Sequence, residues 1–337
     1  MSATAVPSAG PKVSVVVPTG HGVDLLDRCV DALLGQTMPV RDFEILIIDE
    51  HGTHQTQQLV AMWSARALAR GLAIRYVVSS SDRGAAAARN LGVHQARAPV
   101  IAFTDERAVP EPAWLMQGLE RITLGADVVC GCVQAPVPAR PTDYQRDAAR
   151  LETLEFATVN CFIRKSVLES VGGFDEHFDR ATHQDNDLYF RLLDIGAKFV
   201  RAPQAIVIYP VHPAPWGVCL AQSRTLLFDA LLYKKHPERY RQQEQDAPRW
   251  HAYRLDYAIV AALLAFAAAL AAGVYTAAAL AALVWLVLTS MLCARRLKGT
   301  SHRLSHVAEV VLTSALLSPV AVFWRLAGAV RYRVKFA

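Results

Sequence analysis

The sequence predicts an α/β protein, with a mostly parallel sheet sandwiched by helices and a C-terminal helical region that anchors the chain to a membrane. Two observations predict this organisation. From Val13 onward, short β-branched runs alternate with helical patterns, which is typical of βα units on a parallel sheet. Near the other end, residues 257–294 contain no charged side chain. So long an uncharged stretch favours a membrane region over its alternative, a buried helical hairpin of a soluble protein.

The first hundred residues contain four expected strands, at 13–17, 43–48, 73–78 and 100–103. Helical patterns lie between them, one with leucines at three- and four-residue spacing over 25–34 and one over 84–96. Acidic pairs follow two of the strands, Asp49-Glu50 and Asp105-Glu106. Because the carboxyl ends of parallel strands open onto one ligand crevice, we expect these four acids to converge on a single cleft.

Beyond residue 110 the pattern loosens, with prolines at 136, 138 and 141 before a second ordered block at 150–200. This block is interpreted as the second half of the same domain. We therefore expect a flexible N-terminus over 1–11, a catalytic domain over 12–240 and a membrane region over 251–337. The catalytic domain divides into halves at 12–110 and 111–240.

The uncharged stretch 257–294 would be about 57 Å long as one helix, nearly twice the hydrocarbon thickness of a bilayer. Two crossings fit better, near 257–272 and 275–293, with Gly273 in the turn. Four basic residues follow the second crossing: Arg295, Arg296, Lys298 and Arg303. A hairpin returns them to the side of the folded domain, as the positive-inside bias prefers.

A third apolar segment, 307–330, is interrupted by Glu309, Pro319 and Arg325. Basic residues both precede and follow it, so an interfacial or re-entrant helix that keeps the two basic clusters on one side is expected.

Charge and cysteine content exclude other classes of protein. Residues 251–337 contain nine Lys or Arg and two Asp or Glu, a net charge of +7, so residues 1–250 carry −2 within the total of +5. A basic apolar tail behind a nearly neutral domain favours anionic lipids as partners rather than nucleic acid. The first twelve residues lack a secretory signal, so a cytoplasmic domain is expected. The six scattered cysteines are read as buried thiols.

Six segments, in order, resemble the family 2 inverting glycosyltransferases: VVVPT, ILIIDE, DRGAAAARNLG, IAFTDER, RKSVLESVGGFDE and QDNDLYFRLLDIGAKF. The resemblance covers roughly residues 12–240. It implies a Rossmann-like fold of the A-type nucleotide-diphospho-sugar class and transfer of a sugar from a nucleotide diphosphate. That reaction needs a site for the nucleoside, positive charge near the departing diphosphate, and a base for the acceptor hydroxyl.

The resemblance carries the nucleotide-sugar site onto eight positions: Pro18, Thr19, Asp49, Glu50, Arg89, Asn90, Asp105 and Arg107. Asp49 with Glu50 would hold the nucleoside, because a carboxylate accepts hydrogen bonds from ribose hydroxyls and imide N–H groups. Arg89 would meet the diphosphate, and Asn90 would brace the adjoining loop.

The metal motif of the family, Asp-x-Asp, reads here as Asp105-Glu106-Arg107. The resemblance implies a divalent cation, Mg²⁺ or Mn²⁺, held by Asp105 and Glu106. Alternatively, Arg107 supplies part of the positive charge itself. Relatives have a histidine after a later strand; Tyr209 stands at that place here, and His212 is a further candidate metal ligand.

Asp185 is implied as the catalytic base, in a Gln184-Asp185 pair where the family has Glu-Asp. Gln184 cannot raise the pKa of its neighbour as a second carboxylate would, so any elevation must come from elsewhere. Asp187, assigned to the acceptor side with Gln184 and Trp216, is expected to cap the following helix.

The function so predicted is an inverting transfer to a lipid-linked acceptor hydroxyl on the cytoplasmic face of the cell membrane, in glycan or polysaccharide assembly. Two alternatives remain open. One is transfer to a polyprenyl monophosphate, which is already ionised and needs no base. The other is a non-catalytic membrane-bound scaffold, which the departures at Arg107 and Gln184 motivate.

Overall fold

The computed structural model describes residues 10–20, 22–79, 84–178, 183–246 and 250–335, and the side chains of 243–252 are not considered. The chain divides into two compact units. The first comprises the chain up to Pro136 together with Arg150–Pro210, and the second comprises Val137–Ala149 together with the chain from Val211 onward. Each unit is described by itself.

The first unit is built on an eight-stranded sheet of order β3-β2-β1-β4-β7-β6-β8-β5. The strands are β1 Val13–Thr19, β2 Phe43–Asp49, β3 Ala73–Val78, β4 Val100–Phe103, β5 Val109–Pro110, β6 Val128–Gln134, β7 Cys161–Arg164 and β8 Phe199–Ile208. Strands β3, β2, β1 and β4 are parallel, as the sequence predicted. Strand β7 is antiparallel to both β4 and β6, so the sheet is mixed in its second half.

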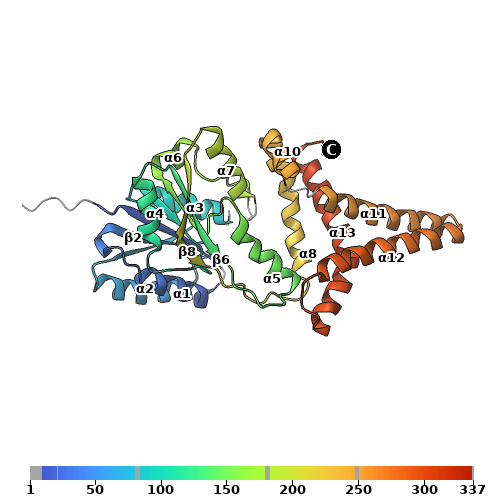
Figure 1. Ribbon diagram of the computed structural model, residues 1–337, viewed down its shortest axis with the longest axis horizontal. Helices are drawn as coiled ribbons and strands as arrows, with labels where there is room; N and C mark the ends of the chain where they lie inside the picture. Colours follow the sequence, from blue (N-terminus) through green and yellow to red (C-terminus); the bar gives the residue numbers. More distant parts are fainter. Residues whose placement is uncertain (1–9, 21, 80–83, 179–182, 247–249, 336–337) are drawn as a thin grey trace, which may run out of the picture. The chain divides into compact units, whose positions relative to one another are not determined.

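Helices cover both faces of this sheet (Figure 1). They are α1 Val23–Leu34, α2 His54–Leu68, α3 Gly84–Gln95, α4 Trp114–Thr123, α6 Lys165–Ser170 and α7 Gln184–Asp194, with short 3₁₀ turns η1 Val40–Asp42 and η2 Ala149–Thr153. One core layer joins the sheet to α1, α2 and α4, and the other joins it to α3, α6 and α7. Val15 and Val16 of β1 enter opposite layers, and because both faces are buried the strand is apolar almost throughout.

The second unit is helical in the part that the structure describes. Its elements are α5 Asp143–Ala148, α8 Val218–Gln222, η3 Ser223–Phe228, α9 Asp229–Lys235, α10 Pro237–Asp246, α11 Trp250–Ala271, α12 Tyr275–Leu297 and α13 Leu304–Tyr332. Three of these helices are long and apolar enough to cross a membrane, over Tyr253–Ala271, Tyr275–Leu297 and Leu304–Tyr332. Helices α11 and α12 form the expected hairpin, and Gly273 lies in its turn with φ 73°.

Helix α13 is continuous through Pro319 and runs across the α11–α12 hairpin rather than along it (Figure 1). Glu309 and Arg325, the charged residues that interrupt its apolar sequence, contact the rest of the unit. Arg325 lies 3.4 Å from Asp229, and Glu309 accepts a hydrogen bond of 2.7 Å from Gly217 N. Seven of its large apolar side chains are exposed, at Leu304, Val311, Leu312, Leu316, Phe323, Leu326 and Val330. This two-faced helix supports the predicted interfacial placement, which stays a prediction.

The division into units differs from the expected boundary at residue 240. Segments 137–149 and 211–240 belong with the apolar helices because of contacts that no local pattern reveals. Arg296 donates from Nη2 to Asp143 at 2.6 Å, across 153 residues of sequence, and Ser301 N donates to Pro141 O at 2.8 Å.

Candidate functional site

The predicted acids do lie along one edge of the sheet. Thr19 at the end of β1 is in register with Asp49 at the end of β2, and Glu50 N donates to Thr19 O at 2.9 Å. Strand β4 runs parallel on the other side of β1 and is followed, after Thr104, by Asp105 and Glu106. The four acids therefore lie at the carboxyl ends of β2 and β4, the two strands that flank β1.

Asp49 is almost fully buried and both of its oxygens accept hydrogen bonds. Tyr76 donates its hydroxyl at 2.7 Å, and His51 N donates at 2.9 Å. Burial and the bond to Asp49 raise the pKa of Tyr76, so this hydroxyl stays a donor. Tyr76 was not identified from the sequence. Its only indication in the sequence was a tyrosine in β3, the strand next to β2, which ends at Asp49. The nucleoside contact predicted for Asp49 and its neighbour Glu50 stays a prediction.

The two acids after β4 have different surroundings. Glu106 is buried, and its Oε2 accepts from Thr19 Oγ1 at 2.5 Å and from Gly20 N at 3.2 Å. Asp105 is partly exposed, and its Oδ1 accepts from Arg107 N at 2.9 Å. Glu106 thus ties the end of β1 to β4, whereas Asp105 is the more accessible carboxylate. Among the described residues, no group of three or more His, Cys, Asp or Glu is placed to hold a metal ion by itself.

Arg89 on α3 is a buried cation. It is 4% exposed, and neither Nε nor Nη1 hydrogen-bonds to any residue that the structure describes. Its guanidinium carbon lies 5.6 Å from the centre of the Phe174 ring, an interaction that offsets only part of the lost hydration. A buried guanidinium with free donors is suited to an anion brought from outside the chain.

Asn90, the next residue, joins α3 to the loop before α7. Its Nδ2 donates to Phe174 O at 2.9 Å, and its Oδ1 accepts from Phe174 N at 2.8 Å. Gly173 approaches this amide with φ 71°, so a side chain there would collide with Asn90. Asn90 therefore fixes the loop around Phe174, whereas the expected bracing of the loop next to α3 and the contact with a nucleotide sugar both stay predictions.

Asp185 lies in the first turn of α7, where Thr158 holds its carboxylate. Thr158 N donates at 3.0 Å and Thr158 Oγ1 at 2.8 Å. Burial raises the pKa of Asp185; the charge of Arg89 and the two bonds from Thr158 act against this rise, and Asp105 adds to it. Burial therefore provides the rise in the pKa of Asp185 that Gln184 cannot provide. Because the charges of Arg89 and Asp105 both act on this pKa, the three residues share one electrostatic environment.

Gln184 and Asp187, close to Asp185 in the sequence, are both buried but differ in their contacts. Gln184 is fully buried, and neither amide atom hydrogen-bonds to a described residue. Asp187 is also buried and pairs with Arg191 at 2.7 Å. Helix α7 begins at Gln184 with His183 as its N-cap residue, so the expectation that Asp187 caps this helix is wrong. An acid three residues beyond the start of a helix pairs one turn onward instead.

Four predicted features lie outside this group of residues. His212 and Trp216 belong to the second unit, so their roles at the site stay predictions. The first two residues of the DRGAAAARNLG segment, at 82–83, lie outside the described residues, as do residues 1–9 of the expected flexible N-terminus.

Comparison with known families identifies the arrangement. The sequence pattern of Glycosyl transferase family 2 matches residues 14–184, and that of Glycosyl transferase family group 2 matches residues 143–327. The chain belongs to glycosyl transferase family 2. It is a glycosyltransferase, and the expected enzyme class is confirmed.

Two curated relatives and one solved structure illustrate the likeness. The chain is 27% identical over 215 residues to glycosyltransferase AglE of Haloferax volcanii, covering 60% of this chain and 68% of the relative. It is 28% identical over 255 residues to validoxylamine A glucosyltransferase of Streptomyces hygroscopicus subsp. jinggangensis, covering 64% and 57%. The mannosyltransferase PcManGT from Pyrobaculum calidifontis, solved with GDP-Man and Mn²⁺, superposes with a TM-score of 0.59 at 21% identity, over 97% of this chain and 88% of its own. This likeness confirms the predicted A-type fold.

The raised pKa of Asp185 predicts that this residue makes the stability of the fold depend on pH. A folded-state pKa above the unfolded value means that ionisation of Asp185 weakens the fold as pH rises through the folded pKa. Asp185→Asn removes that penalty, so the variant should melt above the parent protein at pH 7, and the difference should shrink as the pH falls toward 4. Thermal unfolding of both proteins across this range checks the sign; an advantage for the variant that grows at acid pH would contradict it.

Proposed function

We propose that this glycosyltransferase moves a sugar, with inversion, from a nucleotide-diphosphate donor to a hydroxyl of a lipid-linked acceptor at the cytoplasmic face of the cell membrane. The product would enter glycan or polysaccharide assembly. The observation that carries the proposal is the buried Arg89, a cation with free donors in the same electrostatic environment as Asp185 and Asp105.

A departing nucleoside diphosphate develops negative charge, and fixed positive charge nearby stabilises it. Arg89 meets this need because its guanidinium is already buried, with Nε and Nη1 not bonded to any described residue, so little reorganisation is required when the anion arrives. Arg107, two residues after Asp105, adds a second guanidinium at the same edge of the sheet. The solved relative that contains GDP-Man and Mn²⁺ supports a nucleotide-sugar donor here.

A divalent cation fits the residues present at this edge. Mg²⁺ and Mn²⁺ accept one or two carboxylates plus substrate phosphates and waters, so three protein ligands are not required. Asp105 is the accessible carboxylate, whereas Glu106 is engaged by Thr19 and Gly20 and would need to exchange these bonds. When bound, such a cation neutralises charge on the diphosphate as the donor bond breaks.

Asp185 is the proposed base. Direct displacement at the anomeric carbon requires one group to accept the proton of the acceptor hydroxyl as the diphosphate leaves from the opposite face. A carboxylate with a pKa raised by burial accepts a proton more readily, and the bonds from Thr158 fix its orientation. Asp105 and Asp185 would then act on opposite sides of the transferred sugar.

The acceptor is proposed to be lipid-linked because three helices of the second unit are long and apolar enough to cross a membrane. The basic residues at 295–303 and 331–335 favour the cytoplasmic side for the end of α12 and for both ends of α13, with α13 interfacial or re-entrant as predicted. A donor site on the same chain would meet an acceptor held in the adjoining leaflet.

Arg89→Gln should weaken binding of a nucleoside diphosphate at least tenfold, because the variant removes the buried charge opposite the diphosphate. Binding of the unphosphorylated nucleoside should change less than twofold. Calorimetric titration with uridine and guanosine compounds measures both quantities. Arg97→Gln, which removes an exposed guanidinium just beyond α3, is the matched control. Equal losses for nucleoside and nucleoside diphosphate would contradict the proposed contact.

Membranes containing the full chain and a radiolabelled nucleotide sugar should transfer label into material that chloroform–methanol extracts. Asp185→Ala should reduce this transfer at least a hundredfold without loss of donor binding, because the acceptor hydroxyl then lacks its base. Full transfer by the variant would instead favour a polyprenyl monophosphate acceptor. Label that appears only in water-soluble products would contradict a lipid-linked acceptor altogether.

A further inference from the structure

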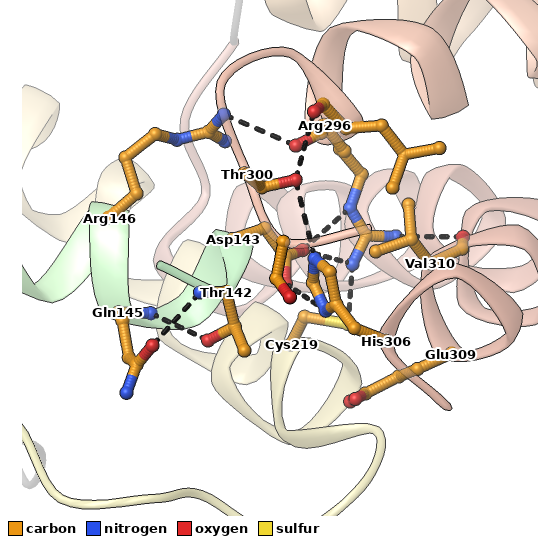
Figure 2. A network of polar contacts seen from close by, with 12 residues as sticks. Thr142, Asp143, Gln145, Arg146, Cys219, Arg296, Thr300, His306, Glu309 and Val310 are labelled. Atoms are coloured by element: carbon orange, nitrogen blue, oxygen red, sulfur yellow. Dashed lines mark hydrogen bonds and ion pairs between the residues drawn. The ribbon is translucent and has the colours of Figure 1, made fainter. Parts of the chain in front are cut away.

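The second unit contains a cavity of about 980 Å³ whose walls come from three segments, 138–145, 213–218 and 301–309. A network of polar contacts holds two of these walls together (Figure 2). Asp143 accepts from Nε and Nη2 of Arg296 at 3.0 and 2.6 Å, and Arg146 donates to the carbonyl oxygens of Arg296 and Lys298. These contacts tie the segment at 138–145 to the end of α12 and the turn that follows it.

Two arginines and two acids line the cavity, and Arg296, which pairs with one of these acids, leaves an excess of one positive charge. Asp143 pairs with Arg296, and Glu309 accepts from Gly217 N. Arg140 and Arg303 are exposed, and the side chain of neither makes a hydrogen bond or an ion pair with any residue in the described part of the chain. A solvated arginine needs no partner, but two arginines that line one cavity attract an anion.

The start of α13 adds donors to the same wall. Arg303 is the N-cap residue and provides no side-chain cap, and the first bond within the helix runs from Val307 N to Arg303 O. Ser305 and His306, in the uncapped first turn of this 29-residue helix, both line the cavity. His306 is 4% exposed, and its Nδ1 makes no hydrogen bond to a described residue and lies 3.8 Å from Asp143 Oδ1. Free N–H groups at a helix start favour an anionic ligand.

The cavity adjoins the ends of two apolar helices. One wall is the turn between α12 and α13, two helices with the length and composition of membrane spans, and this turn places residues 298–303 at their ends. Trp216, 60% exposed, stands among the lining residues, and tryptophan is typical of the boundary between hydrocarbon and water. The exposed apolar face of α13 begins at Leu304, directly beside the cavity wall.

We propose that this cavity binds the phosphate-bearing head group of an anionic membrane phospholipid. Arg140, Arg303 and the start of α13 bind the phosphate, while the acyl chains lie along the apolar face of α13. A volume of about 980 Å³ is far larger than one phosphate needs and accommodates a glycerophosphate head group. The proposal concerns a lipid site in the second unit and does not depend on the donor or acceptor of the transferase.

The test uses the full chain in a neutral detergent, titrated by calorimetry with dihexanoyl phosphatidylglycerol, dihexanoyl phosphatidylcholine and inorganic phosphate. We expect saturable binding of phosphatidylglycerol, at least tenfold tighter than that of either other compound. The double variant Arg140→Gln/Arg303→Gln should weaken it at least tenfold. The control Arg295→Gln/Lys298→Gln, which removes two exposed charges from the same end of α12 but outside the cavity, should change it less than twofold.

A second variant tests the cavity without changing its charge. Ser305→Trp fills the space beside the start of α13, so phosphatidylglycerol binding should fall at least tenfold with both arginines present. Melting temperatures matched to the parent protein show that each variant is folded. Equal losses in both double variants, undiminished binding by Ser305→Trp, or inorganic phosphate bound as tightly as the lipid would each overturn the proposal.

Discussion

The antiparallel placement of β7 beside β4 is the constraint on which the site depends. Phe103, two residues before Asp105, pairs with Cys161, three residues after Thr158. That register brings the threonine that holds Asp185 to the same edge of the sheet as the acids that follow the parallel strands. A fifth parallel strand would have directed the preceding loop to the opposite edge. The groups proposed to bind the donor and to activate the acceptor therefore lie at one edge because β7 runs antiparallel to β4.

Because these groups lie together, opposing electrostatic effects act on Asp185 and Arg89. Burial opposes the charge of Asp185, while Arg89 favours it and is itself buried without hydrogen-bond partners for two of its nitrogens among the described residues. A buried unpaired charge costs several kcal/mol in a folded protein. An incoming diphosphate would relieve that cost at Arg89 and, by neutralising the cation, raise the proton affinity of Asp185 further. Donor binding and base strength are thereby coupled.

The strands and the apolar hairpin could be predicted from sequence because they depend on local periodicity. The runs at 43–48 and 100–103 and the turn at Gly273 all lie where the patterns placed them. The contact that Glu106 makes with Thr19 could not be predicted from local sequence patterns, because it joins residues 87 apart. The same holds for the division into units, which depends on Asp143 meeting Arg296 across 153 positions. Gln184 was noted as a departure from its family, but its buried, unpaired amide required coordinates.

The central claim is that the acidic edge and Arg89 gather a cation and a diphosphate beside Asp185. Crystals of the full chain with Mn²⁺ and a nucleoside diphosphate, examined by anomalous diffraction at the manganese edge, test it most directly. The account predicts one manganese peak at the Asp105 carboxylate, with the diphosphate between that ion and the Arg89 guanidinium. Manganese bound away from Asp105, or a diphosphate that leaves Arg89 without an anionic partner, would contradict it.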